Sequence, residues 1–285
     1  MTLDWARRFA VFADRKTREA ETAVLAPYQT LAEQPPAGFE PLGNPWTRRL
    51  FDGDFYLSPE RGDVPATSLV FVQSRNGNTG ARNPAVLGGG DTDAHLIYEG
   101  LSRIAADGVL AGAETVRGGD IIFSVWHPHL VELRDVMRLP RHPAQIVATL
   151  RGLSFDHTLL FNVPGIPVIV LTVHEQADRM RHELAERPWV TAIEMDDPAD
   201  LRPAFVRLRT LGITRISCIG GRTIAHALTR AGLVQDLHLT TSARDGGDPD
   251  TPVFDEPPPT RVIVKKTGTG PEEGVVFEHL LLRQT

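Results

Sequence analysis

The sequence predicts an α/β protein with a mixed, largely parallel central sheet flanked by helices. Short apolar runs, typical of buried strands, alternate with helical patterns from about residue 68 to residue 240. Such alternation favours parallel strands joined by helices. The end of the chain is rich in strands instead, and a short turn at 267–274 favours an antiparallel pair there.

Composition excludes several classes of protein. The 285 residues are 41% apolar and 23% charged, with a net charge of −6 and no basic block, so we expect no nucleic-acid partner. No apolar run approaches ~18 residues, and the first residues lack an apolar signal core, so we expect no membrane segment. Cys218 is the single cysteine, which excludes an internal disulfide and fits a cytoplasmic location.

Two regions differ in pattern. Residues 1–66 predict an N-terminal amphipathic helix followed by a proline-rich arm with apolar anchors, which we expect to cover a dimer interface or the mouth of a site. Residues 67–285 predict the α/β domain. Its predicted strands are 68–73, 109–111, 145–150, 167–172, 190–195, 215–219, 236–242, 261–266 and 275–282. Its predicted helices are 94–106, with Asp91 as the N-cap, 175–187, 200–211 and one that begins after Gly221 and stops at Gly232.

The segment 213–239 organises the domain. A strand runs into Gly220 and Gly221, and a helix follows from Arg222 and Thr223. Adjacent glycines allow a ligand to approach the backbone, and the free N–H groups of a helix N-terminus suit a phosphate. A tight strand-to-helix turn without a ligand explains the same residues.

Other strand ends carry polar residues. Residues 68–73 open into the loop 74–80, and residues 109–111 lead into a second glycine turn at 112–120. Strands that open into polar loops are where α/β proteins place ligands. His127 and His129 lack a third ligand at suitable spacing, so we expect them to be surface or packing residues and assign no metal site.

Three ordered segments resemble one family, the riboflavin-biosynthesis pyrimidine reductases of the dihydrofolate-reductase-like superfamily. Ser74-Arg75-Asn76-Gly77 resembles its Ser-x-Asp-Gly loop, and residues 102–116 resemble its Leu-Arg-Ala-x-x-Asp-Ala-Ile-Leu-Val-Gly-x-x-Thr-Val stretch. Residues 219–224 with 233–237 resemble its Glu-Gly-Gly-x-x-Leu and Leu-Val-Asp-Glu-Leu. The resemblance covers residue 67 to the C-terminus and concerns the reductase half alone, because the family's zinc deaminase signature is absent from the sequence.

The resemblance implies a homodimeric NADPH-dependent reductase that acts on a small molecule, which can carry a phosphate group. The residues that it places at the cofactor are Gly112, Thr115, Thr149, Arg151, Thr172, Gly220, Gly221, Arg222 and Thr223, with Arg151 a candidate partner of the 2′-phosphate. It places Ser74, Asn76 and Arg103 at the substrate. Glu114 and Asp120 are candidates to relay a proton.

Four departures concern the substrate side. Asn76 replaces the family's aspartate, Ile219 replaces an acid, residues 118–121 replace Asp-Asp-Pro, and a substrate-phosphate arginine is missing near residue 124. We therefore expect hydride transfer to a C=N or C=O carbon of a substrate that differs from the riboflavin intermediate. Two alternatives stay open: a non-catalytic nucleotide-binding protein on the same fold, and a folate reductase.

Overall fold

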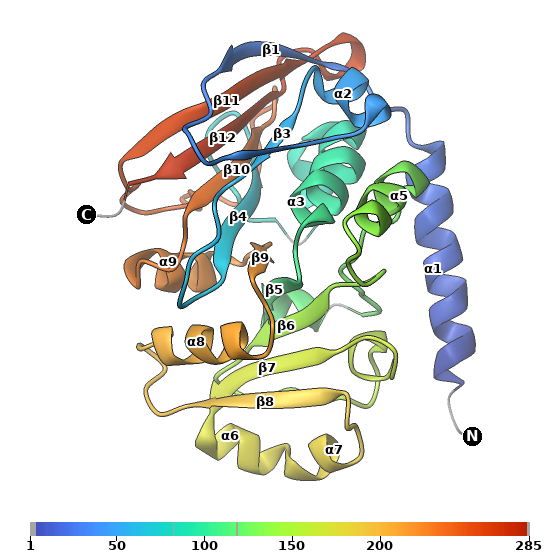
Figure 1. Ribbon diagram of the computed structural model, residues 1–285, viewed down its shortest axis with the longest axis vertical. Helices are drawn as coiled ribbons and strands as arrows, with labels where there is room; N and C mark the ends of the chain where they lie inside the picture. The colour runs from blue at the N-terminus through green and yellow to red at the C-terminus, as the bar shows by residue number, and fades with distance from the viewer. Residues whose placement is uncertain (1–3, 82, 118, 284–285) are drawn as a thin grey trace.

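A computed structural model describes residues 4–81, 83–117 and 119–283. Residues 1–3 of the predicted helical segment, and Gly118 of the second glycine turn, lie outside this range. One large twisted sheet runs through the molecule, with helices on both of its faces (Figure 1). In spatial order its strands are β1 (Tyr28–Glu33), β11 (Thr260–Gly268), β12 (Val276–Leu282), β10 (Asp236–Thr241), β4 (Ala66–Gln73), β9 (Arg215–Cys218), β5 (Gly108–Gly112), β6 (Ala144–Ala148), β7 (Val168–Val173) and β8 (Val190–Met195).

The helices alternate with these strands along the chain. They are α1 (Trp5–Thr22), α2 (Pro45–Phe51), the wide-turn helix η2 (Thr92–Leu101), α3 (Ser102–Ile104), α4 (Ala113–Val116), α5 (Pro128–Val136), α6 (His174–Arg179), α7 (Arg181–Ala185), α8 (Arg202–Thr210) and α9 (Arg222–Arg230). Short 3₁₀ turns are η1 (Pro84–Leu87), η3 (Leu159–Phe161) and η4 (Gly270–Glu272), and β2 (Glu40–Leu42) pairs with β3 (Phe55–Leu57) in a small separate sheet. In the part of the chain that the structure describes, no helix is long and apolar enough to cross a membrane.

The pairing confirms the predicted fold class. From β10 to β8 every neighbouring pair is parallel, whereas β12 and β11 add antiparallel strands beside β10. The predicted antiparallel pair at the end of the chain is therefore correct. The outermost strand, β1, comes from the N-terminal arm and pairs antiparallel with β11, so residues 1–66 contribute to the main sheet.

Two apolar cores cover the two faces of the parallel strands. One contains Leu110, Leu171, Phe205 and Leu228, so it includes the inner sides of α8 and α9. The other contains side chains from the opposite face of the same strands, such as Val109 and Val170, together with Phe12 of α1 and Trp126. Alternate residues of each strand thus enter different cores, as the two-residue period of a strand requires.

The helix predicted for residues 94–106 begins earlier, at Thr92. Asp91 holds the predicted N-cap position, but its own backbone is helical and its side chain makes no capping hydrogen bond. Instead, the carboxylate of Glu272 accepts the hydrogen bond from the N–H of Thr92 at 2.9 Å. A residue 180 positions away satisfies the helix start, which local sequence patterns do not reveal.

Asp107 fixes the start of β9 between β4 and β5. Its Oδ2 accepts hydrogen bonds from the N–H and hydroxyl of Thr214 at 2.8 and 2.7 Å, and from the N–H of Arg215 at 3.0 Å. One carboxylate oxygen therefore satisfies three donors at the amino end of the central strand.

Replacement of Asp107 by alanine leaves these donors without their acceptor. We expect Asp107→Ala to lower the free energy of unfolding by about 1–3 kcal/mol, the usual cost of orphaned polar groups. Urea unfolding measures this change. Asp178→Ala is the matched control, because Asp178 pairs with Arg181 on an exposed helix face, and we expect a change below ~0.5 kcal/mol. Equal losses in the two variants would contradict the role of Asp107.

Candidate functional site

Two neighbouring strands, β4 and β9, stop pairing before the carboxyl edge of the sheet. The ladder between β4 and β9 ends at the pair Leu69 and Cys218, although β4 continues alongside β10 to Gln73. The central strand β9 is therefore shorter than its neighbours. The chain beyond Cys218 turns into the two glycines, and β4 and β9 part at that point.

Both predicted glycine turns meet there. The N–H of Gly112, at the end of β5, donates a hydrogen bond to the carbonyl of Gly220 at 2.8 Å. Gly220 has φ +95°, and a Cβ on it would lie 3.1 Å from the ring of Phe71, so both backbone and packing require glycine. The peptide bond that follows Gly220 is cis.

A cavity of about 580 Å³ opens beside these turns, and we call it the glycine-turn cavity. It lies on the α8–α9 face of the sheet, since Met195, Leu201 and Ala227 form part of its wall. Seven residues that the sequence predicts for a site line it: Gly112, Glu114, Thr115, Thr149, Arg151, Gly221 and Thr223. Residues up to 111 positions apart in the chain thus share one cavity.

The polar groups of this cavity suit an anion. Gly221 is the N-cap of α9 and offers no side chain to the free N–H groups of the first turn. The exposed guanidinium of Arg151 makes no hydrogen bond or ion pair with any residue in the described ranges. By contrast, Arg117 pairs with Glu114 and also donates to the carbonyl of Gly152 at 3.3 Å. Arg151 is therefore available to a ligand.

Three other predicted residues lie outside the cavity wall. Thr172 is fully buried in β7, and its hydroxyl has no partner within the described chain. The side chain of Arg222 donates to the carbonyl of Pro252 at 2.6 Å and pairs with Asp255 at 2.9 Å, so the loop 252–255 holds it. Asp120 forms a two-pronged ion pair with Arg8 of α1 at 2.6 and 2.7 Å. The structure therefore places Asp120 at the N-terminal helix, away from the cavity.

A second cavity of about 650 Å³ lies at the same edge, and we call it the acidic cavity. It borders Val72 at the end of β4 and Tyr98, which packs on the core of the opposite face. The two cavities therefore lie on opposite faces of the sheet, beside the point where β4 and β9 part. Its ionisable wall residues are Lys16, Glu19, Asp91, Asp93, His95, Glu99, Arg244, Glu272 and Glu273.

Asp93 is the most unusual of these groups. It is 8% exposed, and its Oδ1 accepts a hydrogen bond from the hydroxyl of Thr240 at 2.5 Å. Burial, with a smaller contribution from the nearby Glu272, raises the pKa of Asp93 to about 7. The hydrogen bond from Thr240 acts in the opposite direction and lowers it. A carboxyl group that is half protonated near neutral pH inside a cavity can donate or accept a proton.

The mouth of the acidic cavity carries paired and unpaired charges. Lys16 of α1 pairs with Glu99 at 2.8 Å, and His95 lies 3.4 Å from the same carboxylate. Arg244 is exposed at the rim, and its guanidinium makes no contact with another described side chain that would neutralise it. The N-terminal helix thus closes one side of this cavity.

The predicted substrate residues Ser74, Asn76 and Arg103 do not line either cavity. The hydroxyl of Ser74 is 2.5 Å from Oδ1 of Asn76 and 2.8 Å from the carbonyl of Gly246, so the two residues secure the loop after β10. Arg103 is 2% exposed, donates to the carbonyl of Ser124 at 3.1 Å and stacks over Tyr98. In this conformation it supports the wall instead of facing a ligand.

The sequence analysis missed Asp93 and Arg244. The interpretation of residues 91–94 as a helix start hid Asp93, which stands two residues after Asp91, the acid that follows three glycines. Arg244 lay in a segment interpreted only as a loop. His127 and His129 stack on Trp46 with ring centroids 4.2 and 5.1 Å apart, in keeping with their predicted packing role.

Residues 99–276 match the family model of the RibD C-terminal domain. This chain belongs to that family. The match includes both glycine turns and all the β-strands from β5 to β10. It confirms the resemblance to riboflavin-biosynthesis reductases. No curated protein matches the chain in sequence.

Solved structures of the family's reductases share the fold. A pyrimidine reductase-like protein from Corynebacterium diphtheriae is 22% identical, with 78% of this chain and 93% of that chain covered and a TM-score of 0.55. The riboflavin biosynthesis reductase Rib7 of Saccharomyces cerevisiae is 20% identical, with 79% and 93% covered and a TM-score of 0.54. RibD of Acinetobacter baumannii is 18% identical over 78% of this chain and 59% of that chain, with a TM-score of 0.59.

Proposed function

We propose that this protein is an NADPH-dependent reductase that delivers hydride to a C=N or C=O carbon. One observation supports it above all: two glycine turns distant in sequence meet at a cavity that also holds an unpaired arginine and the N-terminus of α9. Membership of the RibD C-terminal domain family agrees with this activity.

The residues present fit a dinucleotide. No atom lies within 4 Å of the position that a Cβ of Gly221 would take, so the backbone there is open to a diphosphate. Thr223 and the N–H groups of the first turn of α9 would hold the diphosphate, and Arg151 would pair with a 2′-phosphate in a bidentate manner. When bound, NADPH supplies the hydride.

The remaining chemistry falls to the protein. The parting of β4 and β9 lies between the glycine-turn cavity and the acidic cavity, where a reactive carbon would have access to both. Asp93, protonated in part at neutral pH, would donate a proton to the nitrogen or oxygen atom that gains charge during reduction. Glu114 is a weaker candidate because it pairs with Arg117 and is largely exposed.

The wall charges indicate the substrate class. Six carboxyl groups face Lys16, His95 and Arg244 in the acidic cavity. We infer a substrate whose ring presents amino or amide N–H donors, with any phosphate group restricted to Arg244 at the rim. Such a cavity differs from a site that binds a phosphate group in its interior. The difference agrees with the sequence, in which Asn76 and Ile219 replace acidic residues of the family pattern.

Gly221→Asp tests the cofactor site. The new carboxylate fits the backbone, because φ is −73° and no atom obstructs the Cβ, but it repels a diphosphate. We expect the dissociation constant for NADPH, measured by calorimetric titration, to rise by about 100-fold or more with an unchanged thermal midpoint. Gly165→Asp makes the same change in charge at an exposed turn that also has space, and should bind normally. Unchanged binding in Gly221→Asp would exclude this cavity as the cofactor site.

The pH profile tests Asp93. The protonated acid is the active form, so kcat/KM should decrease as pH rises through about 7, the pKa of Asp93. Asp93→Asn should reduce kcat by about 10²–10⁴-fold and abolish this decrease, with NADPH binding retained. Asp120→Asn should keep the profile, because Arg8 holds that carboxylate elsewhere.

NADPH binding without oxidation by any member of a panel of cyclic imines and amino-substituted carbonyl compounds would favour the non-catalytic alternative.

A further inference from the structure

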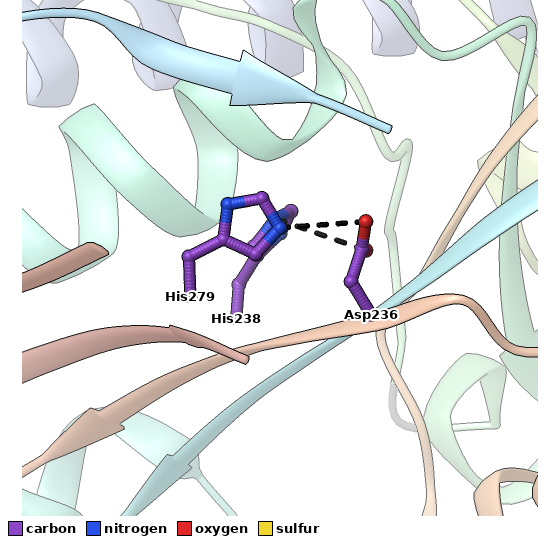
Figure 2. Close-up of side chains that lie close together, drawn as sticks. All are labelled: Asp236, His238 and His279. Atoms are coloured by element: carbon purple, nitrogen blue, oxygen red, sulfur yellow. Dashed lines mark ion pairs between the residues drawn. The ribbon is translucent and has the colours of Figure 1, made fainter. Parts of the chain in front are cut away.

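A second cluster lies at the amino end of β10, apart from both cavities. Asp236 and His238 alternate along β10, so their side chains share one face of the sheet. His279 of β12 is the direct cross-strand partner of His238. Figure 2 shows both imidazole rings directed at the carboxylate of Asp236.

The three side chains are buried, and the contacts between them are ion pairs that are too long to be good hydrogen bonds. Asp236 and His279 are each 1% exposed, and His238 is 3% exposed. Both carboxylate oxygens and all four ring nitrogens have no hydrogen-bond partner within the described residues. Unsatisfied buried polar groups are rare, and six of them in one cluster indicate a ligand that would satisfy them.

Both distances within the cluster are longer than good hydrogen bonds, and the shorter one matches the separation of two ligands of one metal ion. Nε2 of His279 lies 3.4 Å from Oδ2 of Asp236, and Nε2 of His238 lies 3.9 Å from Oδ1. A good N–H···O hydrogen bond spans about 2.7–3.2 Å. Two ligands that are each about 2.1 Å from a tetrahedral zinc ion lie about 3.4 Å apart. One ligand atom from each of the three residues lies within 4.8 Å of the others.

Space for a fourth ligand adjoins the cluster. A cavity of about 30 Å³ borders Ser68 and His238, and Ser68 lies opposite Asp236 in the parallel pair of β4 and β10. This volume accommodates one water molecule. Phe55 of β3 also borders this cavity and packs on the cluster, with its ring centroid 4.8 Å from that of His238 and 6.0 Å from that of His279.

We propose that Asp236, His238 and His279 bind a divalent transition-metal ion of the zinc type, with a water molecule as the fourth ligand. Two imidazoles and one carboxylate form a ligand set that such ions favour. The three ligands are buried, and they lie at the opposite edge of the sheet from the glycine turns. We therefore assign the site a structural role. It ties β10 to β12 next to the arm that carries β3.

Metal binding to the intact chain is the first test. After removal of metal with a chelator, we expect calorimetric titration with Zn²⁺ to give one site per chain and Zn²⁺ to raise the thermal midpoint. His279→Gln and Asp236→Asn should each weaken Zn²⁺ binding by at least about 100-fold. His226→Gln is the matched control, since His226 lies 3.7 Å from the carboxylate of Asp255 without a second histidine, and it should bind Zn²⁺ normally.

If a variant of one of these buried residues fails to fold, a crystal of the unmutated chain grown with Zn²⁺ still tests the proposal. Anomalous diffraction at the zinc edge should place a peak between the three side chains. Absence of a peak there, no Zn²⁺ binding in solution, or equal affinity in His279→Gln and the unmutated chain would overturn the proposal. These outcomes are independent of NADPH binding.

Discussion

The hydrogen bond from Gly112 to Gly220 is the contact on which the proposed site depends. It joins the ends of β5 and β9 and brings together two turns that are 108 residues apart in the chain. Because Asp107 secures the other end of β9, the short central strand is fixed at both ends. The pairing of β9 with β4 ends at Leu69 and Cys218, and we call the point where the two strands then part the gap.

The two cavities beside this gap differ in charge for a physical reason. The glycine-turn cavity presents backbone N–H groups and arginines, so it attracts phosphate oxygens. The acidic cavity has mainly carboxyl groups. Burial keeps Asp93 partly protonated near neutral pH, and Lys16 neutralises Glu99 in part. Anionic cofactor and amino-bearing substrate would each be favoured on a separate face, which would orient the pair across the sheet.

Local sequence patterns predicted the strands from β4 onward, because buried strands leave clear apolar runs such as 167–172. They also predicted the glycine turns, since Gly220 and Gly221 follow such a run directly. They did not predict β1, β2 or β3, which lie in the N-terminal segment. The position of β9 between β4 and β5 is a long-range property that no local pattern contains.

The remaining site residues were not predicted, because their surroundings also depend on contacts between distant parts of the chain. Asp93 resembles an ordinary helix-start residue until burial and Thr240 give it an unusual environment. His238 and His279 are 41 residues apart, and only the register of β10 against β12 makes them neighbours. The family resemblance supplied the cofactor positions. Asp120 was a proton-relay candidate on its chemistry alone, and the structure holds it in an ion pair with Arg8 of the N-terminal helix.

A crystal structure of the chain with NADP⁺ would test the central claim most directly. The account predicts the diphosphate at Gly221 and Thr223, the 2′-phosphate at Arg151, and the nicotinamide at the gap between β4 and β9 with access to Asp93. A nucleotide bound elsewhere, or a nicotinamide that turns away from this gap, would contradict it.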